Sequence, residues 1–326
     1  MRAWQITELG EPEDVLGLVD LDPPAVGEGL LRIRVDATGL GLPDVFMCRG
    51  SYAFKPELPF TPGQEVVGHV VETCDGGPPV GTRVAAVTAF FLGNGGFAEE
   101  ALALAASTYA APAELSDLEA AGFCIPLHTA WIGLVSRGRI QAGETVLVTG
   151  AAGSSGAAAI QLAKHLGARV IASARGEEKG AYCRALGADE VIDHAKVDLA
   201  ETVNALTGGR GAEAIYEVVG GETFMTATRC VASEGRILAV GFASGAWANA
   251  STARLVQANA GVLGVYVGAY DHGQMTEIHE ELLGLHAQGA FQHAVTHEWP
   301  FEELPTALQA LADRGAIGKS VLRVSG

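Results

Sequence analysis

The chain has 326 residues, of which 48% are hydrophobic and 18% are charged, and its formal net charge at pH 7 is −17. These values are typical of a globular protein with room for two domains, and they exclude a disordered chain. The acidic excess would repel nucleic acid and anionic membrane surfaces, so neither is expected as a partner.

The residues at the start of the chain and the cysteines bear on where the protein works. Met1–Glu8 lacks the long apolar core of a secretory signal. The five cysteines are scattered, odd in number and without a C-x-x-C pair, which favours reduced thiols. We therefore expect a cytoplasmic protein.

Residues 1–122 read as many short strands separated by glycine and proline. Apolar and polar residues alternate over 31–37, and further strands are predicted at Glu65–Glu72 and Arg83–Val87. A glycine- and proline-rich turn at Asp75–Pro79 separates the last two segments. This pattern predicts a β-rich, barrel-like domain.

From residue 123 to residue 289, strands alternate with helices. Such alternation predicts a doubly wound parallel sheet with its ligand at the carboxyl ends of the strands. The predicted strands are Val146–Thr149, Val170–Ser173, Glu190–Ile192, Ala214–Val219, Ile237–Gly241 and Val262–Val267. Two further strands, Ala294–Glu298 and Ser320–Val324, lie in a tail, 290–326, that we expect to rejoin the first domain.

A glycine-rich turn between a buried strand and a helix is the most informative motif. The uncharged run Thr145–Thr149 is typical of a strand buried on both faces, and it is followed by Gly150, Gly153 and Gly156. Apolar residues then recur at helical spacing. A helix N-terminus reached through such a turn binds pyrophosphate through backbone N–H groups, so the motif predicts a dinucleotide. Ala151 stands where the fingerprint has its first glycine, and a glycine-rich connection in another α/β protein is the alternative.

The end of the second strand of this domain indicates which dinucleotide binds. An NAD site usually has an acidic residue there, whereas this chain reads Ala172-Ser173-Ala174-Arg175, with Lys179 one helical turn later. Two cations suit a 2′-phosphate, so we expect NADPH. The alternative for Lys179 is a solvated helix face beside its two acidic neighbours.

Motifs along nearly the whole chain resemble the zinc-independent quinone oxidoreductase branch, which includes zeta-crystallin, of the medium-chain dehydrogenase/reductase superfamily. They are Gly39–Asp44, Arg49–Tyr52, Leu58–Glu65, Gly143–Gly153, Leu186–Asp193, Gly241–Gly245, Gly264–Tyr270 and Gly318–Leu322. The resemblance implies an α/β fold with a GroES-like β-rich catalytic domain and a doubly wound Rossmann cofactor domain.

The resemblance also implies a set of cofactor contacts. The phosphate loop falls on Ala152, Gly153, Ser154, Ser155 and Gly156, and the 2′-phosphate lysine falls on Lys179. The nicotinamide-side loop falls on Phe242, Ala243 and Ser244, and a threonine at the domain junction falls on Thr129. The remaining expected contacts are Ser173, Arg175, His194, Val219, Val265 and Lys319.

Several positions depart from the family pattern. His194 stands where an aromatic residue often lies against the adenosine phosphate, and Gly41 replaces a frequent asparagine. Phe46 replaces a tyrosine, Ser154-Ser155 replaces a glycine and an apolar residue, and no asparagine precedes Thr129. These changes bear on substrate contacts more than on the fold.

We expect no bound metal. Zinc-dependent members of the superfamily have Gly-His-Glu where this chain has Gly63-Gln64-Glu65, and no cysteine lies in the Gly39–Asp44 loop. Without a Lewis acid, the enzyme suits acceptors that take up hydride easily, such as quinones and conjugated enones. Tyr52 is the candidate donor to substrate oxygen, with Thr129 as second catalytic candidate; alternatively, Tyr52 only packs over its loop.

Three functions stay open. An NADPH-dependent quinone reductase is favoured, and an enone or enoyl-thioester reductase on the same scaffold is the alternative enzyme. A non-catalytic NADPH-binding protein is the third reading.

A homodimer is also expected. Ala260–Ala269 is uncharged and contains the last predicted strand of the parallel sheet, which two copies could pair across a two-fold axis. The alternative is an edge covered by the helix predicted around Thr276–His286.

Overall fold

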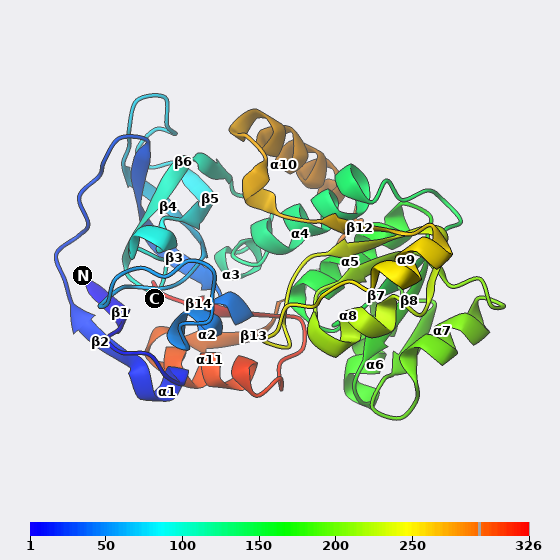
Figure 1. The fold of residues 1–326 in the computed structure, drawn as a ribbon. Coiled ribbons are helices and arrows are strands. Elements are labelled where there is room, and N and C mark those ends of the chain that lie inside the picture. Colours follow the sequence, from blue (N-terminus) through cyan, green and yellow to red (C-terminus); the bar gives the residue numbers. More distant parts are fainter. Residues whose placement is uncertain (293–294, 326) are drawn as a thin grey trace. The chain divides into compact units, whose positions relative to one another are not determined.

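The computed structural model describes residues 1–292 and 295–325. Two compact units divide the chain (Figure 1). The β-rich unit comprises Met1–Ile125, Asp271–His279 and His293–Gly326, of which 295–325 are described in the last segment. The α/β unit comprises Pro126–Tyr270 and Glu280–Gln292. The expected boundaries after residues 122 and 289 lie within three residues of two of these divisions, and the short segment 271–279 was not anticipated.

The β-rich unit is built on a six-stranded sheet in the order β13-β14-β3-β4-β5-β6. An additional antiparallel pairing of β3 with β6 closes the last four strands into a small barrel. A separate hairpin pairs β1 with β2. The strands are β1 (Arg2–Ile6), β2 (Leu16–Asp20), β3 (Leu30–Gly39), β4 (Glu65–Glu72), β5 (Arg83–Thr88), β6 (Glu100–Ala110), β13 (Val295–Pro300) and β14 (Lys319–Arg323).

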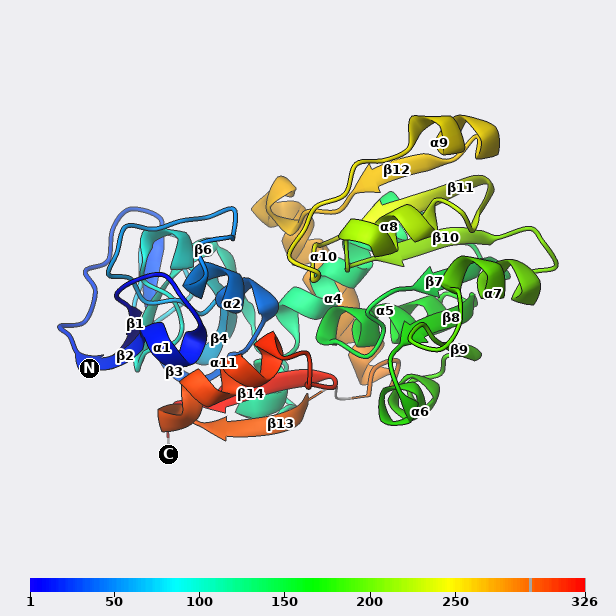
Figure 2. The ribbon, with the colours of Figure 1, turned by 60° about the horizontal axis from the view of Figure 1, so that its bottom comes forward.

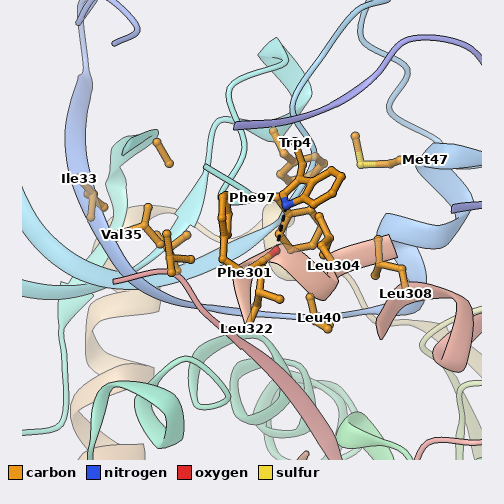
Figure 3. Close-up of a cluster of buried hydrophobic side chains, with 14 of the residues drawn as sticks. Trp4, Ile33, Val35, Leu40, Met47, Phe97, Phe301, Leu304, Leu308 and Leu322 are labelled. Carbon is orange, nitrogen blue, oxygen red and sulfur yellow. Dashed lines mark hydrogen bonds between the residues drawn. The ribbon is translucent and has the colours of Figure 1, made fainter. Parts of the chain in front are cut away.

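The tail of the chain forms two strands of the sheet in the β-rich unit. Strand β14 runs antiparallel to β3, with Val321 opposite Gly39, and β13 runs parallel to β14. The indole N–H of Trp4 donates to the carbonyl oxygen of Phe301 at 2.9 Å, and Leu322 packs in the same apolar cluster (Figure 3). The first residue of the predicted strand Ala294–Glu298 lies outside the described residues.

Short helices complete the β-rich unit. They are α1 (Pro12–Val15), α2 (Leu42–Cys48), α3 (Asp117–Ala120) and α11 (Leu304–Ala312), with 3₁₀ turns at Phe90–Leu92 and Phe301–Glu303. Helix α10 (His272–Ala287) and helix α4 (Cys124–Trp131) each cross a boundary between the units.

The α/β unit contains a parallel six-stranded sheet in the order β12-β11-β10-β7-β8-β9 (Figure 2). The chain winds outward from β7 in both directions, so the topological switch lies between β7 and β10, where α/β proteins bind ligands. The strands are β7 (Thr145–Val148), β8 (Arg169–Ala174), β9 (Glu190–Asp193), β10 (Ala212–Glu217), β11 (Val231–Ala239) and β12 (Gly261–Gly264). This is the predicted doubly wound Rossmann sheet.

Helices connect these strands and pack on the sheet. Every residue of β7 is buried, as its uncharged sequence predicts. The helices are α5 (Ser154–His165), α6 (Glu177–Ala185), α7 (Leu199–Leu206), α8 (Gly221–Ala227) and α9 (Thr252–Ala258), with a π-helical segment at Ile132–Arg137 and a 3₁₀ turn at Val267–Ala269.

One helical stretch among the described residues, Asp117–Arg137, is long and apolar enough to cross a membrane. Of the 18-residue segment of this stretch that is most apolar, 67% is buried inside the protein. Such burial is the mark of a core helix, so length and composition alone do not make it a membrane span.

Candidate cofactor site

The turn between β7 and α5 depends on two glycines for different reasons. Gly150 adopts φ +56°, in the left-handed region that glycine enters without steric cost. Gly156 lies in the first turn of α5, where an added Cβ would lie 2.5 Å from the carbonyl oxygen of Gly150 and 2.6 Å from Cα of Ala151. The missing side chain therefore lets the helix lie directly against the loop.

Gly153 is the N-cap of α5, and no side chain caps the helix. A Cβ added at Gly153 would meet only the Gly150 carbonyl oxygen, at 3.4 Å, so space is open in front of the helix. The first N–H groups of a helix have no intrahelical partner and carry positive partial charge. The residues present therefore fit a pyrophosphate.

The hydroxyl of Ser155 is engaged elsewhere, so it is not available to a phosphate in front of α5. Its Oγ lies 2.8 Å from the hydroxyl oxygen of Tyr216, a fully buried side chain of β10. The side chain of Ser155 therefore anchors α5 to the sheet, and its backbone N–H is the group left for a phosphate. Ala152, one of the other predicted loop contacts, is buried in the turn.

A buried carboxylate shapes the loop that follows β10. Glu217 is fully buried and accepts hydrogen bonds from the backbone N–H of Val219 at 2.9 Å and of Gly220 at 3.0 Å. The hydroxyl of Thr149, at the end of β7, donates to the same carboxylate at 3.1 Å. Burial raises the pKa of Glu217, while these donors lower it. Sequence reasoning missed both residues, although an acidic residue ending an apolar strand is a readable signal.

The loop after β11 lies on the loop after β10. The backbone N–H of Ala243 donates to the Val218 carbonyl at 3.0 Å, and that of Ser244 donates to the Val219 carbonyl at 2.8 Å. The ring of Phe242 stacks on Trp247, with centroids 4.4 Å apart. The structure therefore brings together Val219, Ala243 and Ser244, which the resemblance assigns to the cofactor.

A cluster of cationic groups lies past the ends of β8 and β9. Arg175 is exposed and forms no ion pair with any residue in 1–292 or 295–325. Burial lowers the pKa of Lys179, on α6, and the Arg175 guanidinium lowers it further. Burial also lowers the pKa of His194, as do the charges of Arg175 and Lys179. Arg175 thus acts electrostatically on both Lys179 and His194, while Glu178 and Asp193 act on these two residues in the opposite sense.

Ser173 ties this cluster to the sheet. Its Oγ lies 3.1 Å from Nδ1 of His194, and Ser173 is buried in β8. Lys179 is half-buried rather than a fully solvated surface residue. Of its two acidic neighbours, Glu177 lies 3.3 Å from Arg184, and Glu178 raises the pKa of Lys179.

Two predicted residues lie in the β-rich unit. Tyr52 is half-buried, and its ring packs against Phe54 and Phe90, with centroids 6.0 and 6.4 Å away. Lys319 is buried; its Nζ donates to the carbonyl oxygen of Leu40 at 3.0 Å and forms an ion pair with Glu65. The charge of Lys319 is thus neutralised inside this unit, which sequence reasoning did not anticipate.

Thr129 and Val265 lie in the α/β unit. Thr129 is half-buried in α4. Val265 is buried directly after β12, where its N–H donates to the Ala239 carbonyl at 3.0 Å. The assignment of both to the cofactor stays a prediction.

The region that would hold zinc in a zinc-dependent relative contains different donors here. Gln64 is 8% exposed, and its Nε2 has no hydrogen-bond partner among the described residues. Asp44 is 1% exposed; its Oδ2 accepts from the N–H of Gly41 at 2.9 Å, and its Oδ1 has no described partner. Burial raises the pKa of Asp44 to about 7. An amide, a carboxyl of raised pKa and a carboxylate paired with lysine do not fit zinc, which prefers thiolate and imidazole ligands.

Comparisons with known proteins give the family. The family model "Alcohol dehydrogenase GroES-like domain" matches residues 27–113, and the model "Zinc-binding dehydrogenase" matches residues 156–284. A quinone oxidoreductase-like protein 2 homolog from Nematostella vectensis is 34% identical over 335 aligned positions, covering 98% of this chain and 88% of the relative. The chain belongs to the quinone oxidoreductase-like family. It is thus an oxidoreductase of the medium-chain dehydrogenase/reductase superfamily, as the sequence motifs indicate.

Two solved structures are similar to this quinone oxidoreductase-like enzyme over nearly their full lengths. A mycobacterial protein complexed with NADPH is 31% identical, with a TM-score of 0.92, covering 99% of this chain and all of that chain. Escherichia coli quinone oxidoreductase complexed with NADPH is 26% identical, with a TM-score of 0.91 and the same coverage.

Proposed function

We propose that this enzyme is an NADPH-dependent reductase that transfers hydride to a quinone or a similar conjugated carbonyl without a metal. The observation that carries the cofactor choice is the cationic cluster at the end of β8. Arg175 and Lys179 stand where an NAD site has an acidic residue, and their mutual repulsion favours a bound anion. The two NADPH complexes among the similar structures support the same choice.

The chain's own residues bind and orient the cofactor. The uncapped N-terminus of α5 suits the pyrophosphate, and the absence of a Cβ at Gly153 leaves room for it. The loops of Val219, Ala243 and Ser244 are joined by backbone hydrogen bonds, so they can support the nicotinamide side rigidly. When bound, NADPH supplies the hydride.

The acceptor class follows from the donors around Gln64. Since Gln64, Asp44 and Glu65 do not make a zinc ligand set, these residues offer no Lewis acid to a developing alkoxide. A quinone or an enone spreads the incoming negative charge over a conjugated system, so it needs less stabilisation. We propose Tyr52 as the donor to substrate oxygen, with Thr129 as the second catalytic residue.

An enone or enoyl-thioester reductase remains the alternative activity, and a non-catalytic NADPH-binding protein is the third. Oxidation of NADPH, followed by absorbance with a panel of quinones, enones and enoyl thioesters, separates the three. Fastest turnover with quinones supports the proposal. Turnover confined to enoyl thioesters favours the alternative, and NADPH binding without any turnover favours the non-catalytic reading.

We also propose a homodimer formed through the edge of the parallel sheet. Strand β12 is the edge strand, and Val262 is 36% exposed on it. Val256 and Tyr266, near the two ends of this strand in the sequence, are 75% and 58% exposed. An apolar edge that stays exposed in the single chain favours pairing over coverage by a helix.

The five cysteines are all free thiols in the structure. Reduced thiols agree with a cytoplasmic location, which we propose on this ground and on composition.

A further inference from the structure

His194 is a position where this chain departs from its family, and the charges of Arg175 and Lys179 act on it. His194 follows β9 directly and is exposed. One ring nitrogen, Nδ1, lies 3.1 Å from Oγ of the buried Ser173. The ring is therefore fixed at one nitrogen, and Nε2 is the nitrogen left for a ligand.

The charges that act on His194 come from three elements. Arg175 follows β8, Lys179 lies on α6, and Asp193 is the last residue of β9. Both cations oppose protonation of the imidazole, and Asp193 favours it. The Asp193 carboxylate is already engaged, since it lies 3.2 Å from Nζ of Lys196 and accepts from the N–H of Ala195 at 3.1 Å. Partial burial of the ring is the largest cause that lowers the pKa of His194, and the two cations lower it further, so the protein alone favours the neutral imidazole.

A phosphate monoester reverses this balance. It carries about −1.5 to −2 charges near pH 7 and offers three acceptor oxygens. Placed among Arg175, Lys179 and His194, it would neutralise the repulsion that opposes protonation and would accept a hydrogen bond from the ring. A neutral imidazole next to such a group becomes a better base.

We propose that His194 is a third cationic ligand of the 2′-phosphate of NADPH, and that NADPH binding is accompanied by uptake of a proton on its imidazole. In the protonated form, Nδ1–H donates to Oγ of Ser173 and Nε2–H donates to the phosphate. This inference rests on the proposed function, because it requires a bound 2′-phosphate.

The sign of the pH dependence follows. The bound state holds more protons than the free protein between the pKa of His194 without ligand and its higher pKa in the complex. The contribution of His194 to affinity is present in full at low pH and is lost as the pH rises through its pKa in the complex. The 2′-phosphate also titrates, with a pKa of about 6. The role of His194 is therefore judged from the difference in proton uptake and in NADPH affinity between the protein and a variant of His194.

The matched variants are His194→Gln and His165→Gln. Glutamine keeps a donor at the reach of Nε2 but cannot take up a proton, and the exposed position is tolerant of the change. His165 is an exposed histidine at the far end of α5, outside the cluster, so it controls for loss of a histidine from the same unit.

The experiment is titration calorimetry with NADPH and with NADH in two buffers of different ionisation enthalpy, at several pH values. We expect the protein and His165→Gln to take up more protons on binding NADPH than His194→Gln does, and no such difference with NADH. We expect His194→Gln to bind NADPH about tenfold more weakly at pH 6, the size of one charge-assisted hydrogen bond, with the gap closing by pH 8.5.

Equal proton uptake by the protein and His194→Gln, or an affinity gap that does not narrow with pH, overturns the inference. If the protein still prefers NADPH and Arg175→Ala abolishes that preference, the proposed function stands and only the role of His194 fails. If the protein binds NADPH and NADH equally, the cofactor proposal fails together with this inference. Titration of the His194 ring by NMR is an independent readout, because its midpoint must rise when NADPH is added.

Discussion

The carbonyl oxygen of Gly150 lies where a side chain on Gly156 would have to be: an ideal Cβ would approach it to 2.5 Å. Neither group can move easily, since Gly150 belongs to the turn after β7 and Gly156 to the first turn of α5. The contact therefore fixes how closely the helix approaches the sheet, and this closeness sets the position of the helix N-terminus.

Gly153→Ala and Gly156→Ala should separate binding from folding. Alanine at 156 clashes with backbone, so it should lower the free energy of unfolding by about 1–3 kcal/mol. Alanine at 153 meets no atom closer than 3.4 Å and needs no positive φ, so the variant should fold normally. Its added Cβ would take up space proposed for the pyrophosphate, so it should bind NADPH at least about tenfold more weakly. Thermal unfolding and calorimetric binding measure the two effects. Normal NADPH affinity in Gly153→Ala would show that the phosphates lie elsewhere.

The architecture could be predicted because it is encoded locally. The uncharged strand before Gly150, the glycine turn and the helical spacing after it belong to one short stretch, and β7 and α5 form there. Predicted strand ends were less accurate. Ala214–Val219 ends at Glu217 in the structure, because that carboxylate binds the next backbone N–H groups and turns the chain.

Only candidate site residues that lie close together in the sequence could be grouped from the sequence alone. Arg175 and Lys179 could be read together because a strand end and the next helical turn bring them together. The ion pair between Lys319 and Glu65 spans 254 positions, and no local pattern indicates it. The burial of Val265, likewise, depends on how the edge strand packs.

Asp44→Asn should change how stability depends on pH. The pKa of Asp44 rises from 3.8 to about 7 in the folded protein, so the folded state binds more protons than the unfolded state between these values. The free energy of unfolding therefore falls as pH rises through this window, by up to about 4 kcal/mol. Asparagine can still accept from Gly41 and cannot ionise.

Asp44→Asn should thus be more stable than the unchanged protein at pH 8 and about equally stable at pH 4. Denaturant unfolding at both pH values measures this, with the exposed Asp75→Asn as the control. A variant less stable than the protein at pH 8 would mean that the ionised carboxylate is needed in the interior.

Elemental analysis should find no stoichiometric zinc, and a chelator should leave activity unchanged. Besides the unsuitable donors around Gln64, the β-rich unit contains two buried residues of types that can bind zinc, Cys124 and His279. Burial raises the pKa of the Cys124 thiol, which disfavours the thiolate that zinc binds. A ring nitrogen of His279, Nε2, already lies 2.9 Å from the carbonyl oxygen of Ala110. About one zinc per chain, with activity lost on chelation, would overturn the metal-free proposal.

Val262→Asp should dissociate the proposed dimer. Val262 is exposed on β12, so a charge there should spare the fold, whereas Val265 is 7% exposed and a charge there would destabilise the unit itself. Sedimentation at micromolar concentration should give twice 33.6 kDa for the protein and 33.6 kDa for the variant. A monomeric protein would refute the dimer, and a variant of unchanged mass would place the interface elsewhere.

The ratio of kcat/KM for NADPH to that for NADH, with one quinone as acceptor, tests the central claim most directly. We expect the ratio to favour NADPH about tenfold to a hundredfold, the size of one charge-assisted hydrogen bond to the 2′-phosphate. Arg175→Ala should raise KM for NADPH by that factor and leave NADH unchanged, whereas Arg184→Ala, which removes a surface cation on α6 paired with Glu177, should change neither. Equal use of the two cofactors by the unchanged protein, or no turnover of quinone, would contradict the account.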